Sequence, residues 1–541
     1  MDDVRLFLLF VLGVVLLTTI VSIISAIFNK KQLVTKINQL WPNRQKLENF
    51  IRPNARYDYQ YQTYRSNYDE NSLIDNKTWS DLNMDALFQS MNFNFTAIGE
   101  MRLYATLRGG MFKANNKELK RYFKHNRSFR NQVAFHLAQI GKSVYPHFPD
   151  QLKPIKGNIL FMFAPLLPII TLVYTFINTS NGIMVLVLAC VFNIILSVSL
   201  KKTYEQDLKT IFYTANILSQ SKKLTEIEGT PDLNVNFNHF KSARYLSGLL
   251  VKIEGGDFAS AFILLIKTVF MLDYTIFHII QNSYYKYLEE VLNCYDYIGQ
   301  LDNHYAISLY QETLDEYCEP EIIQSQDTQH YLCDFEDLTH PLITDAVPND
   351  LSINQNILLT GSNASGKSTF MKAVALNLIL AQSIETATAS QFKYVPGLVF
   401  TSMANADDVL SGDSYFMAEL KSIRRLFNIS TDKQIYCFID EIFKGTNTTE
   451  RIAASESVLT YLNNIPNYYV LAATHDIELS SLLSPSFINY HFNESIKNDS
   501  IDFDFKIKPG KANTRNAIEL LRLTQFPNDI YKRAKQQVEN Q

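Results

Sequence analysis

The stretch NILLTGSNASGKSTFMKAVALNLILAQS runs from Asn356 to Ser383 and contains the spacing G-x-x-x-x-G-K-[ST]. Its apolar residues before the first glycine predict a strand, and those at helical spacing after the serine predict a helix. In such a strand-loop-helix, the glycines let backbone N–H groups converge on phosphate oxygens at a helix N-terminus. We therefore expect a nucleotide-binding loop made of Gly361, Ser362, Asn363, Ala364, Ser365, Gly366, Lys367, Ser368 and Thr369.

Two further apolar runs end in residues that suit phosphoryl transfer. Ile435–Ile439 leads into Asp440 and Glu441, and Tyr468–Ala473 leads into Thr474 and His475. Each pattern alone is a common strand end. The three together predict an ATPase with a mostly parallel sheet of the P-loop NTPase class.

Each of these side chains has a role that follows from its chemistry. Lys367 is expected to reach the outer phosphates of ATP, and Ser368 and Asp440 are expected to hold Mg²⁺. Glu441 would orient or deprotonate the attacking water, and His475 would sense the γ-phosphate. Lys367, Glu441 and His475 are therefore the candidate catalytic residues.

Four ordered motifs within 331–541 resemble those of the MutS mismatch-repair ATPases. The phosphate loop is similar to that of the family, with Asn363 at the position of its asparagine. DDVLSGDSYFMAE (407–419) resembles the signature segment, GTNTTE (445–450) the loop after the acidic pair, and ATHD (473–476) the histidine switch. The match continues upstream through His340-Pro341 and 348–350. The resemblance implies an ABC/MutS-like fold and a homodimer in which Ser414 reaches the ATP bound by the opposite subunit.

Two other stretches, 85–107 and 295–322, resemble the opening and the close of the MutS helical core. Nothing before residue 80 looks like the mismatch-reading domain of that family, and the chain ends soon after a helix expected near Asp529. Mismatch recognition is therefore not implied, whereas the ATPase and its helical transmission are.

Three apolar runs are expected to cross a membrane. Leu6–Phe28 carries no charge, and Ile159–Ile177 and Ile183–Leu200 form a hairpin separated by a short polar turn. Lysines follow the first run and flank the hairpin, so the positive-inside bias places the intervening chain and the ATPase in the cytoplasm. These lysines are Lys30, Lys31, Lys36, Lys153, Lys156, Lys201 and Lys202. The protein is thus expected in the inner (cytoplasmic) membrane as a multi-pass protein.

Phe258–Ile280 is apolar almost throughout, but it contains Lys267 and Asp273. Each charge would cost about 2.5 to 3.5 kcal/mol near the centre of a membrane helix. A fourth crossing would also place the phosphate loop outside. We therefore expect one buried helix here and not a span.

These patterns predict five regions. They are a membrane anchor (1–28), a cytoplasmic linker with the start of the helical core (29–156), a transmembrane hairpin (157–200), a helical core or lever domain (201–330) and the ATPase domain (331–541). The five cysteines form no C-x-x-C pair, so neither a zinc site nor a disulfide framework is indicated. Five tyrosines in Arg52–Asn71 could stack on nucleic-acid bases, but a tyrosine-rich linker is favoured because few arginines accompany them.

The predicted cofactors are ATP and Mg²⁺, and two functions compete for this ATPase. The first is a membrane-anchored MutS-like ATPase that moves its helical domain on DNA, either mismatched or branched. The second is a membrane-tethered mechanochemical ATPase that acts on a protein or on the membrane. The net charge of −4 gives no nucleic-acid footprint. An ABC-type transporter is a weaker third reading, since only Leu410-Ser411-Gly412 echoes its signature.

Overall fold

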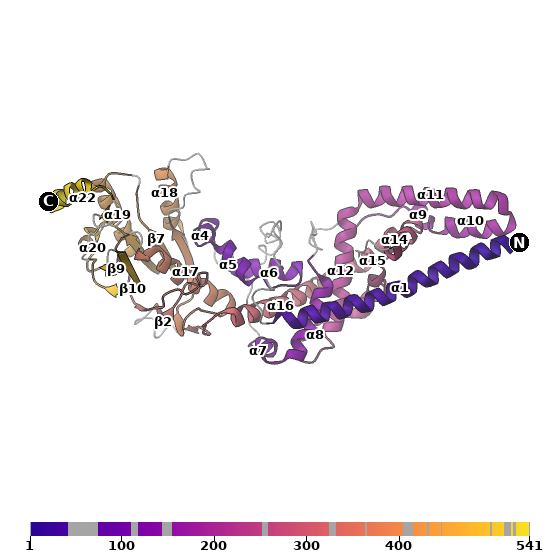
Figure 1. The fold of residues 1–541 in the computed structure, drawn as a ribbon, viewed down its shortest axis with the longest axis horizontal. Coiled ribbons are helices and arrows are strands. Elements are labelled where there is room, and N and C mark those ends of the chain that lie inside the picture. The colour runs from indigo at the N-terminus through magenta and orange to yellow at the C-terminus, as the bar shows by residue number, and fades with distance from the viewer. Residues whose placement is uncertain are drawn as a thin grey trace. The chain divides into compact units, whose positions relative to one another are not determined.

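The computed structural model describes residues 2–41, 74–109, 117–142, 154–250, 258–323, 332–362, 365–403, 415–429, 432–444, 446–497, 500–512, 521–522 and 526–539. The chain divides into two compact units (Figure 1). A helical unit comprises 1–63, 92–102 and 116–309, and a sheet unit comprises 64–91, 103–115 and 310–541. The tyrosine-rich stretch 52–71 lies outside the described residues.

The helical unit consists of helices of four to 39 residues. They are α1 (Asp2–Leu40), α6 (Ala97–Leu107), α7 (Lys117–His125), α8 (Arg127–Ile140), α9 (Ile159–Phe163), α10 (Leu166–Ile177), α11 (Thr179–Thr203), α12 (Glu205–Leu224), η4 (Phe237–Phe240), α13 (Lys241–Leu250), α14 (Phe258–Val269), α15 (Leu272–Lys286) and α16 (Leu288–Thr313). α6 and α16 begin in this unit and end in the sheet unit.

A buried carboxylate joins α6 to α16. Asp302 of α16 accepts hydrogen bonds from the backbone N–H of Phe95 at 2.9 Å and from that of Thr96 at 2.8 Å, so it caps the start of α6 from another helix. Burial raises the pKa of Asp302 to about 6, although these hydrogen bonds oppose the shift. A Cβ at Gly99 would lie 2.1 Å from Asp302 Oδ2, which explains a glycine at this contact.

The apolar helices differ from the predicted spans in their continuity. The predicted span Ile159–Ile177 is interrupted near Pro165, which separates α9 from α10. Among the described residues one helix, α11, is long and apolar enough to cross a membrane, and the bent pair α14 and α15 would provide a second if it acts as one span. The predicted first span falls within α1.

Phe258–Ile280 is not one buried helix, so that prediction is wrong. The chain breaks after Val269, where Met271 adopts a left-handed φ of 47°, and the two helical pieces meet at 69°. α15 buries one face, whereas Leu264 of α14 is half exposed. Asn193 of α11 donates to the carbonyl of Ala164 and to that of Val269, both at 2.8 Å, so one buried amide binds the carbonyls at two helix breaks.

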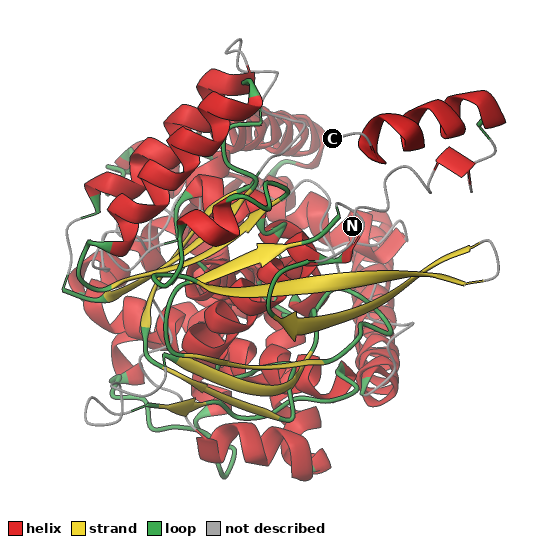
Figure 2. Cartoon of the chain, turned by 90° about the vertical axis from the view of Figure 1, so that its left-hand side faces the viewer, coloured by secondary structure: helices red, strands yellow, loops and turns green. Residues whose placement is uncertain are grey.

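The sheet unit contains two sheets (Figure 2). Its strands are β1 (Glu321–Ile322), β2 (Cys333–Leu338), β3 (Asn349–Ile353), β4 (Ile357–Thr360), β5 (Gln391–Tyr394), β6 (Gly397–Ser402), β7 (Gln434–Asp440), β8 (Tyr468–Thr474), β9 (Ile488–Lys497) and β10 (Ser500–Pro509). Its remaining helices are α4 (Asn76–Asp81), α5 (Met84–Met91), α17 (Lys367–Ile384), α18 (Tyr415–Arg424), η7 (Arg425–Asn428), α19 (Thr448–Asn463), α20 (Leu479–Leu482) and α22 (Asn528–Glu539).

The six-stranded sheet has the order β10-β9-β4-β8-β7-β6, and all its pairings are parallel except that of β9 with β10. The predicted mostly parallel α/β fold is therefore confirmed. β8 lies between β4 and β7. Because parallel strands end at the same edge, the residues that follow these three strands meet there.

The two units divide the chain differently from the predicted regions. The sequence grouped 29–156 as a linker and the start of the helical core and 201–330 as the helical core or lever domain, whereas 64–91, 103–115 and 310–330 lie in the sheet unit. The reason is contact between segments that are distant in sequence. The buried carboxylate of Asp81 in α4, for example, accepts a hydrogen bond from Thr401 of β6 at 2.8 Å.

Candidate nucleotide-binding site

The phosphate loop connects β4 to α17, as the sequence predicted. Gly361 has a φ of 136° and Gly366 a φ of 102°, both in the region that favours glycine. Space is also short at Gly361, where a Cβ would lie 3.0 Å from the carbonyl oxygen of Phe492. Within the loop, Ser365 Oγ donates to the carbonyl of Ser362 at 2.7 Å. The glycines are therefore required by the backbone path of the loop.

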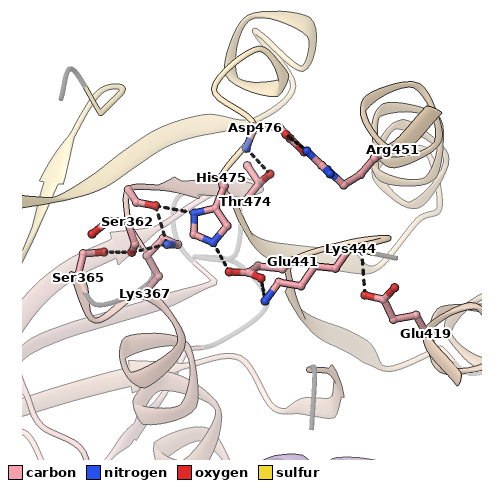
Figure 3. Close-up of polar contacts among 11 residues, drawn as sticks. Ser362, Ser365, Lys367, Glu419, Glu441, Lys444, Arg451, Thr474, His475 and Asp476 are labelled. Carbon is pink, nitrogen blue, oxygen red and sulfur yellow. Dashed lines mark hydrogen bonds and ion pairs between the residues drawn. The ribbon is translucent and has the colours of Figure 1, made fainter. Parts of the chain in front are cut away.

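Lys367 begins α17 and directs its ammonium back into the loop. Its Nζ donates to the carbonyls of Gly361 and Ser362, each at 2.7 Å (Figure 3). The side chain is 2% exposed. A positive charge is thus held among backbone groups at a helix N-terminus, which is where phosphate oxygens are bound in loops of this type.

His475 lies between the phosphate loop and the acidic strand end because β8 lies between β4 and β7. Its Nδ1 is 3.0 Å from the carbonyl oxygen of Gly361, and its Nε2 contacts Glu441 Oε1 (Figure 3). Burial lowers the pKa of His475, and the nearby Lys367 ammonium lowers it further. A neutral imidazole carries one N–H, so it can donate to only one of these two acceptors at a time.

Glu441 has a strained backbone conformation. Its φ is 55°, a left-handed conformation that is unusual for a residue other than glycine, and its N–H donates to the carbonyl of Ala473 at 3.0 Å. Its carboxylate contacts His475 on one side and forms an ion pair with Lys444 on the other (Figure 3). Such strain concentrates at functional sites, because the surroundings must hold the residue in place.

The residues expected to hold Mg²⁺ fit that role. Asp440 ends β7, and its Oδ1 is shielded from solvent with no hydrogen-bond partner within the described part of the chain. Ser368 is half-buried in the first turn of α17. One hydroxyl, one carboxylate and phosphate oxygens satisfy a hard cation of this kind, which keeps several of its waters. When bound, the ion would neutralise charge on the transferred phosphoryl group.

A cavity of about 310 Å³ opens beside the loop. Its lining includes Leu338, His340, Val347, Thr369, Phe370 and Phe505. Burial lowers the pKa of His340 to about 4, so this histidine is neutral at pH 7. The cavity therefore presents apolar and aromatic surface without a cationic side chain from His340.

The structure brings together Gly361, Ser362, Lys367, Glu441 and His475, which come from three strand ends. Ser365, Gly366, Ser368 and Thr369 belong to the same loop and helix start, and Asp440 precedes Glu441. Asn363, Ala364 and Ser414 lie outside the described residues.

Sequence reasoning missed two contributions to the site. Lys444 pairs with Glu441, and Arg451 of α19 binds both carboxylate oxygens of Asp476, at 2.8 and 2.6 Å. This second pair anchors the residue that follows His475. The spacing of Lys444 three residues after Glu441 was visible in the sequence, but the partner of Arg451 was not.

Comparison with known proteins places this site in a family. Residues 357–541 match the family model described as MutS domain V. The chain is similar to DNA mismatch repair protein MutS 2 of Halobacterium salinarum, with 30% identity over 208 residues, or 36% of this chain and 24% of that protein. It is also similar to DNA mismatch repair protein MutS of Streptococcus mutans, with 28% identity over 306 residues, or 54% and 34%.

A third relative, DNA mismatch repair protein MutS of Fusobacterium nucleatum, is 33% identical over 208 residues, or 36% of this chain and 23% of that protein. The chain thus spans 23% to 34% of the length of these relatives. The matched family model begins at the first residue of β4 and covers the phosphate loop, the acidic strand end and His475. By this match, residues 357–541 form a MutS domain V.

Proposed function

We propose that this protein is a membrane-anchored, Mg²⁺-dependent ATPase that couples ATP binding and hydrolysis to movement of its helical unit. The contact of His475 with both Gly361 and Glu441 carries the proposal. It links the phosphate loop to the candidate general base, so a change at the loop can alter the position of the Glu441 carboxylate. Lys367 would bind the outer phosphates, and Ser368 and Asp440 would hold the metal. The apolar cavity beside Gly366 offers room for the adenine base of ATP.

Helix α16 supports the coupling. It spans 26 residues, and its last turn lies in the sheet unit. There Gln311 Nε2 donates to Thr386 Oγ1 at 2.7 Å, just after the C-terminal end of α17. The phosphate loop starts α17, so one helix connects the nucleotide end of the site to the end of α16.

Membrane anchoring is supported by apolar side chains on the surface of the helical unit. Ile177, Leu188 and Ile195 are among the large apolar residues that α10 and α11 expose, at 80%, 59% and 65%. A water-soluble surface seldom carries such a continuous apolar face. We propose three crossings, in α1, α9 with α10, and α11, with the N-terminus outside and the ATPase in the cytoplasm, because lysines flank these segments on the cytoplasmic side.

We propose that this ATPase acts on DNA, because the relatives with the same domain are named DNA mismatch repair proteins. The competing proposal is that it acts on a protein or on the membrane itself. The exposed apolar helices and the net charge of −4 favour this second reading.

Two substitutions separate binding from chemistry at the site. Glu441→Gln should retain Mg·ATP binding but hydrolyse ATP at least about 10²-fold more slowly, because a positioned general base is lost. Lys367→Ala should instead weaken Mg·ATP binding, because its ammonium acts on the bound phosphates. Titration calorimetry and steady-state ATPase rates measure the two effects. Glu456→Gln makes the same change elsewhere in the sheet unit and should behave as wild type. Wild-type turnover in both site variants would remove this site from consideration.

Dimerisation through the ATPase should be visible by complementation. If Ser414 completes the partner's site, mixing Lys367→Ala chains with Ser414→Ala chains restores one working site in each heterodimer, since both lesions then fall in the other site. The wild-type specific ATPase rate should also rise with protein concentration. If Ser414 merely caps a helix, Ser414→Ala would lower the free energy of unfolding by about 1 kcal/mol, and the specific ATPase rate would not depend on protein concentration. Full activity of Ser414→Ala at all concentrations would contradict the composite site.

Topology can be read by labelling introduced cysteines in cells. Ser180→Cys lies in the exposed first turn of α11, next to the end of α10, and Tyr461→Cys lies on the exposed face of α19. A membrane-impermeant maleimide should label Ser180→Cys in intact cells and Tyr461→Cys only after permeabilisation. The parent protein controls for its five native cysteines. Labelling of Tyr461→Cys in intact cells would exclude the proposed orientation.

A salt titration distinguishes the two proposals. We expect the detergent-solubilised protein to bind branched DNA with an affinity that falls steeply with salt, because phosphate contacts release counterions. Fluorescence anisotropy from about 50 to 200 mM salt provides the slope. No binding at the lowest salt would refute the DNA proposal and leave a protein or the membrane as the partner.

A further inference from the structure

Helix α14 is apolar but buries little of its surface. Its described side chains, those of Ala261 and 263–269, are mostly apolar, yet none of them is fully buried. Leu264 and Leu265 are each half exposed. The next helix, α15, buries one face within the helical unit. An exposed apolar surface of this kind indicates contact with another apolar molecule or phase.

α14 lies beside two of the helices that are proposed to cross the membrane. It packs against α11 and α1 (Figure 1). Asn193, within the apolar part of α11, donates to the carbonyl of Val269 at the end of α14. Asn193 precedes Lys201 by eight residues, or about 12 Å of helix, and Lys201 marks the cytoplasmic end of the proposed span. The end of α14 is therefore level with the hydrocarbon core and not with the headgroups.

The helices that flank α14 lie together at the same end of α11. α13 comes before α14, α15 follows it, and both pack against α12. α12 begins at Glu205, directly after the lysines that end α11. With α11 oriented as proposed, the chain enters and leaves α14 from the cytoplasmic side. The two helices also meet at 69°, so α14 does not continue the line of α15 across a bilayer.

The charges that would make a full crossing costly are paired at the base of α14. Lys267 Nζ lies 3.1 Å from Asp273 Oδ1, and Lys201 Nζ lies 3.5 Å from Asp273 Oδ2. The Asp273 carboxylate is thus level with the cytoplasmic end of α11. A long lysine side chain can reach such a boundary from within the apolar layer, and pairing lowers the cost of both charges.

We propose that α14 is a re-entrant membrane segment, which enters the bilayer from the cytoplasmic side and returns through α15 without crossing. Its exposed face, with Leu264 and Leu265, contacts the acyl chains of the lipid. Asn193 holds it there, because it pairs the Val269 carbonyl where water is scarce. The inference rests on the proposed membrane anchoring of α11. Because α15 packs within the helical unit, a movement of that unit would tilt α14 in the lipid.

Two other arrangements would also explain an exposed apolar helix. In one, α14 and α15 form a single bent span, which places α13 and α15 on opposite sides of the membrane. In the other, the exposed face of α14 binds a second copy of the chain in water. The re-entrant arrangement differs from both, because its two flanks are cytoplasmic while α14 itself contacts lipid.

Lipid contact can be measured on the full-length protein in phosphatidylcholine vesicles that carry bromine in the middle of the acyl chains. Bromine quenches a tryptophan that lies among those chains. Leu264→Trp should lose at least about half as much fluorescence as Leu188→Trp on α11, because both side chains would lie in the hydrocarbon core. Tyr245→Trp, on the exposed face of α13, is the matched control and should not be quenched. The parent protein gives the background of the two native tryptophans.

The sides on which the flanks lie can be measured with a membrane-impermeant maleimide. Ser242→Cys in α13 and Asn282→Cys in α15 are both at exposed positions. Both should react only after the cells are permeabilised. Reaction of one flank alone in intact cells would show a bent span and overturn the re-entrant segment.

The role of Asn193 can be tested in the Leu264→Trp background. Asn193→Leu keeps α11 apolar but removes the donor to the carbonyls of Ala164 and Val269. Quenching of the tryptophan should fall at least about twofold, because an unpaired carbonyl is costly among acyl chains and α14 would move towards water. Asn181→Leu makes the same change in the exposed first turn of α11 and should leave the quenching unchanged. Equal quenching in both variants would remove Asn193 from the proposal.

The tryptophan series separates this inference from the proposal on which it rests. If Leu188→Trp is quenched and Leu264→Trp is not, α14 does not contact lipid, and membrane anchoring through α11 still stands. If Leu188→Trp is not quenched, the proposed anchoring is overturned, and the re-entrant segment with it.

Discussion

The contacts of His475 depend on one constraint, the position of β8 between β4 and β7. Parallel strands in this order end at a common edge, so the phosphate loop, the histidine and the acidic pair meet without a long connection between them. His475 then reaches the Gly361 carbonyl on one side and the Glu441 carboxylate on the other. The strained backbone of Glu441 is held by the carbonyl of Ala473, in the same strand that carries the histidine. The order of the strands therefore determines the geometry of the candidate catalytic residues.

The helical unit uses buried polar groups in a similar way. Asp302 caps α6 from α16, and Lys142 pairs at 2.7 Å with Glu100, which is itself 0% exposed. A buried carboxylate is costly unless its oxygens are bonded, so Asp302 specifies how α6 meets α16, and Glu100 how α6 meets the chain after α8, more than they add stability. Both helices continue into the sheet unit. Within the helical unit, the start of α6 is thus held against α16 by interactions that tolerate few alternatives.

The apolar helices show what hydropathy leaves out. A hydropathy window treats Ile159–Ile177 and Phe258–Ile280 as continuous runs, yet both are broken, and α9 and α14 are too short to span a bilayer core alone. Backbone groups freed at a break need partners where water is scarce. Asn193 supplies its amide to a carbonyl at each break, so a polar residue in the middle of α11 has a structural role.

The sequence alone determined the strand-loop-helix of Gly361–Thr369, the mostly parallel sheet and the side chains at three strand ends, because local periodicity and short motifs encode them. It could not determine that His475 lies between Gly361 and Glu441, that Arg451 binds Asp476, or that α4 binds β6. Those contacts join residues far apart in the chain, such as Asp81 and Thr401. The paired residues are between 25 and 320 positions apart, and no local pattern records a partner at such a distance. Only tertiary packing, which buries both groups and removes the alternative of water, selects the pair.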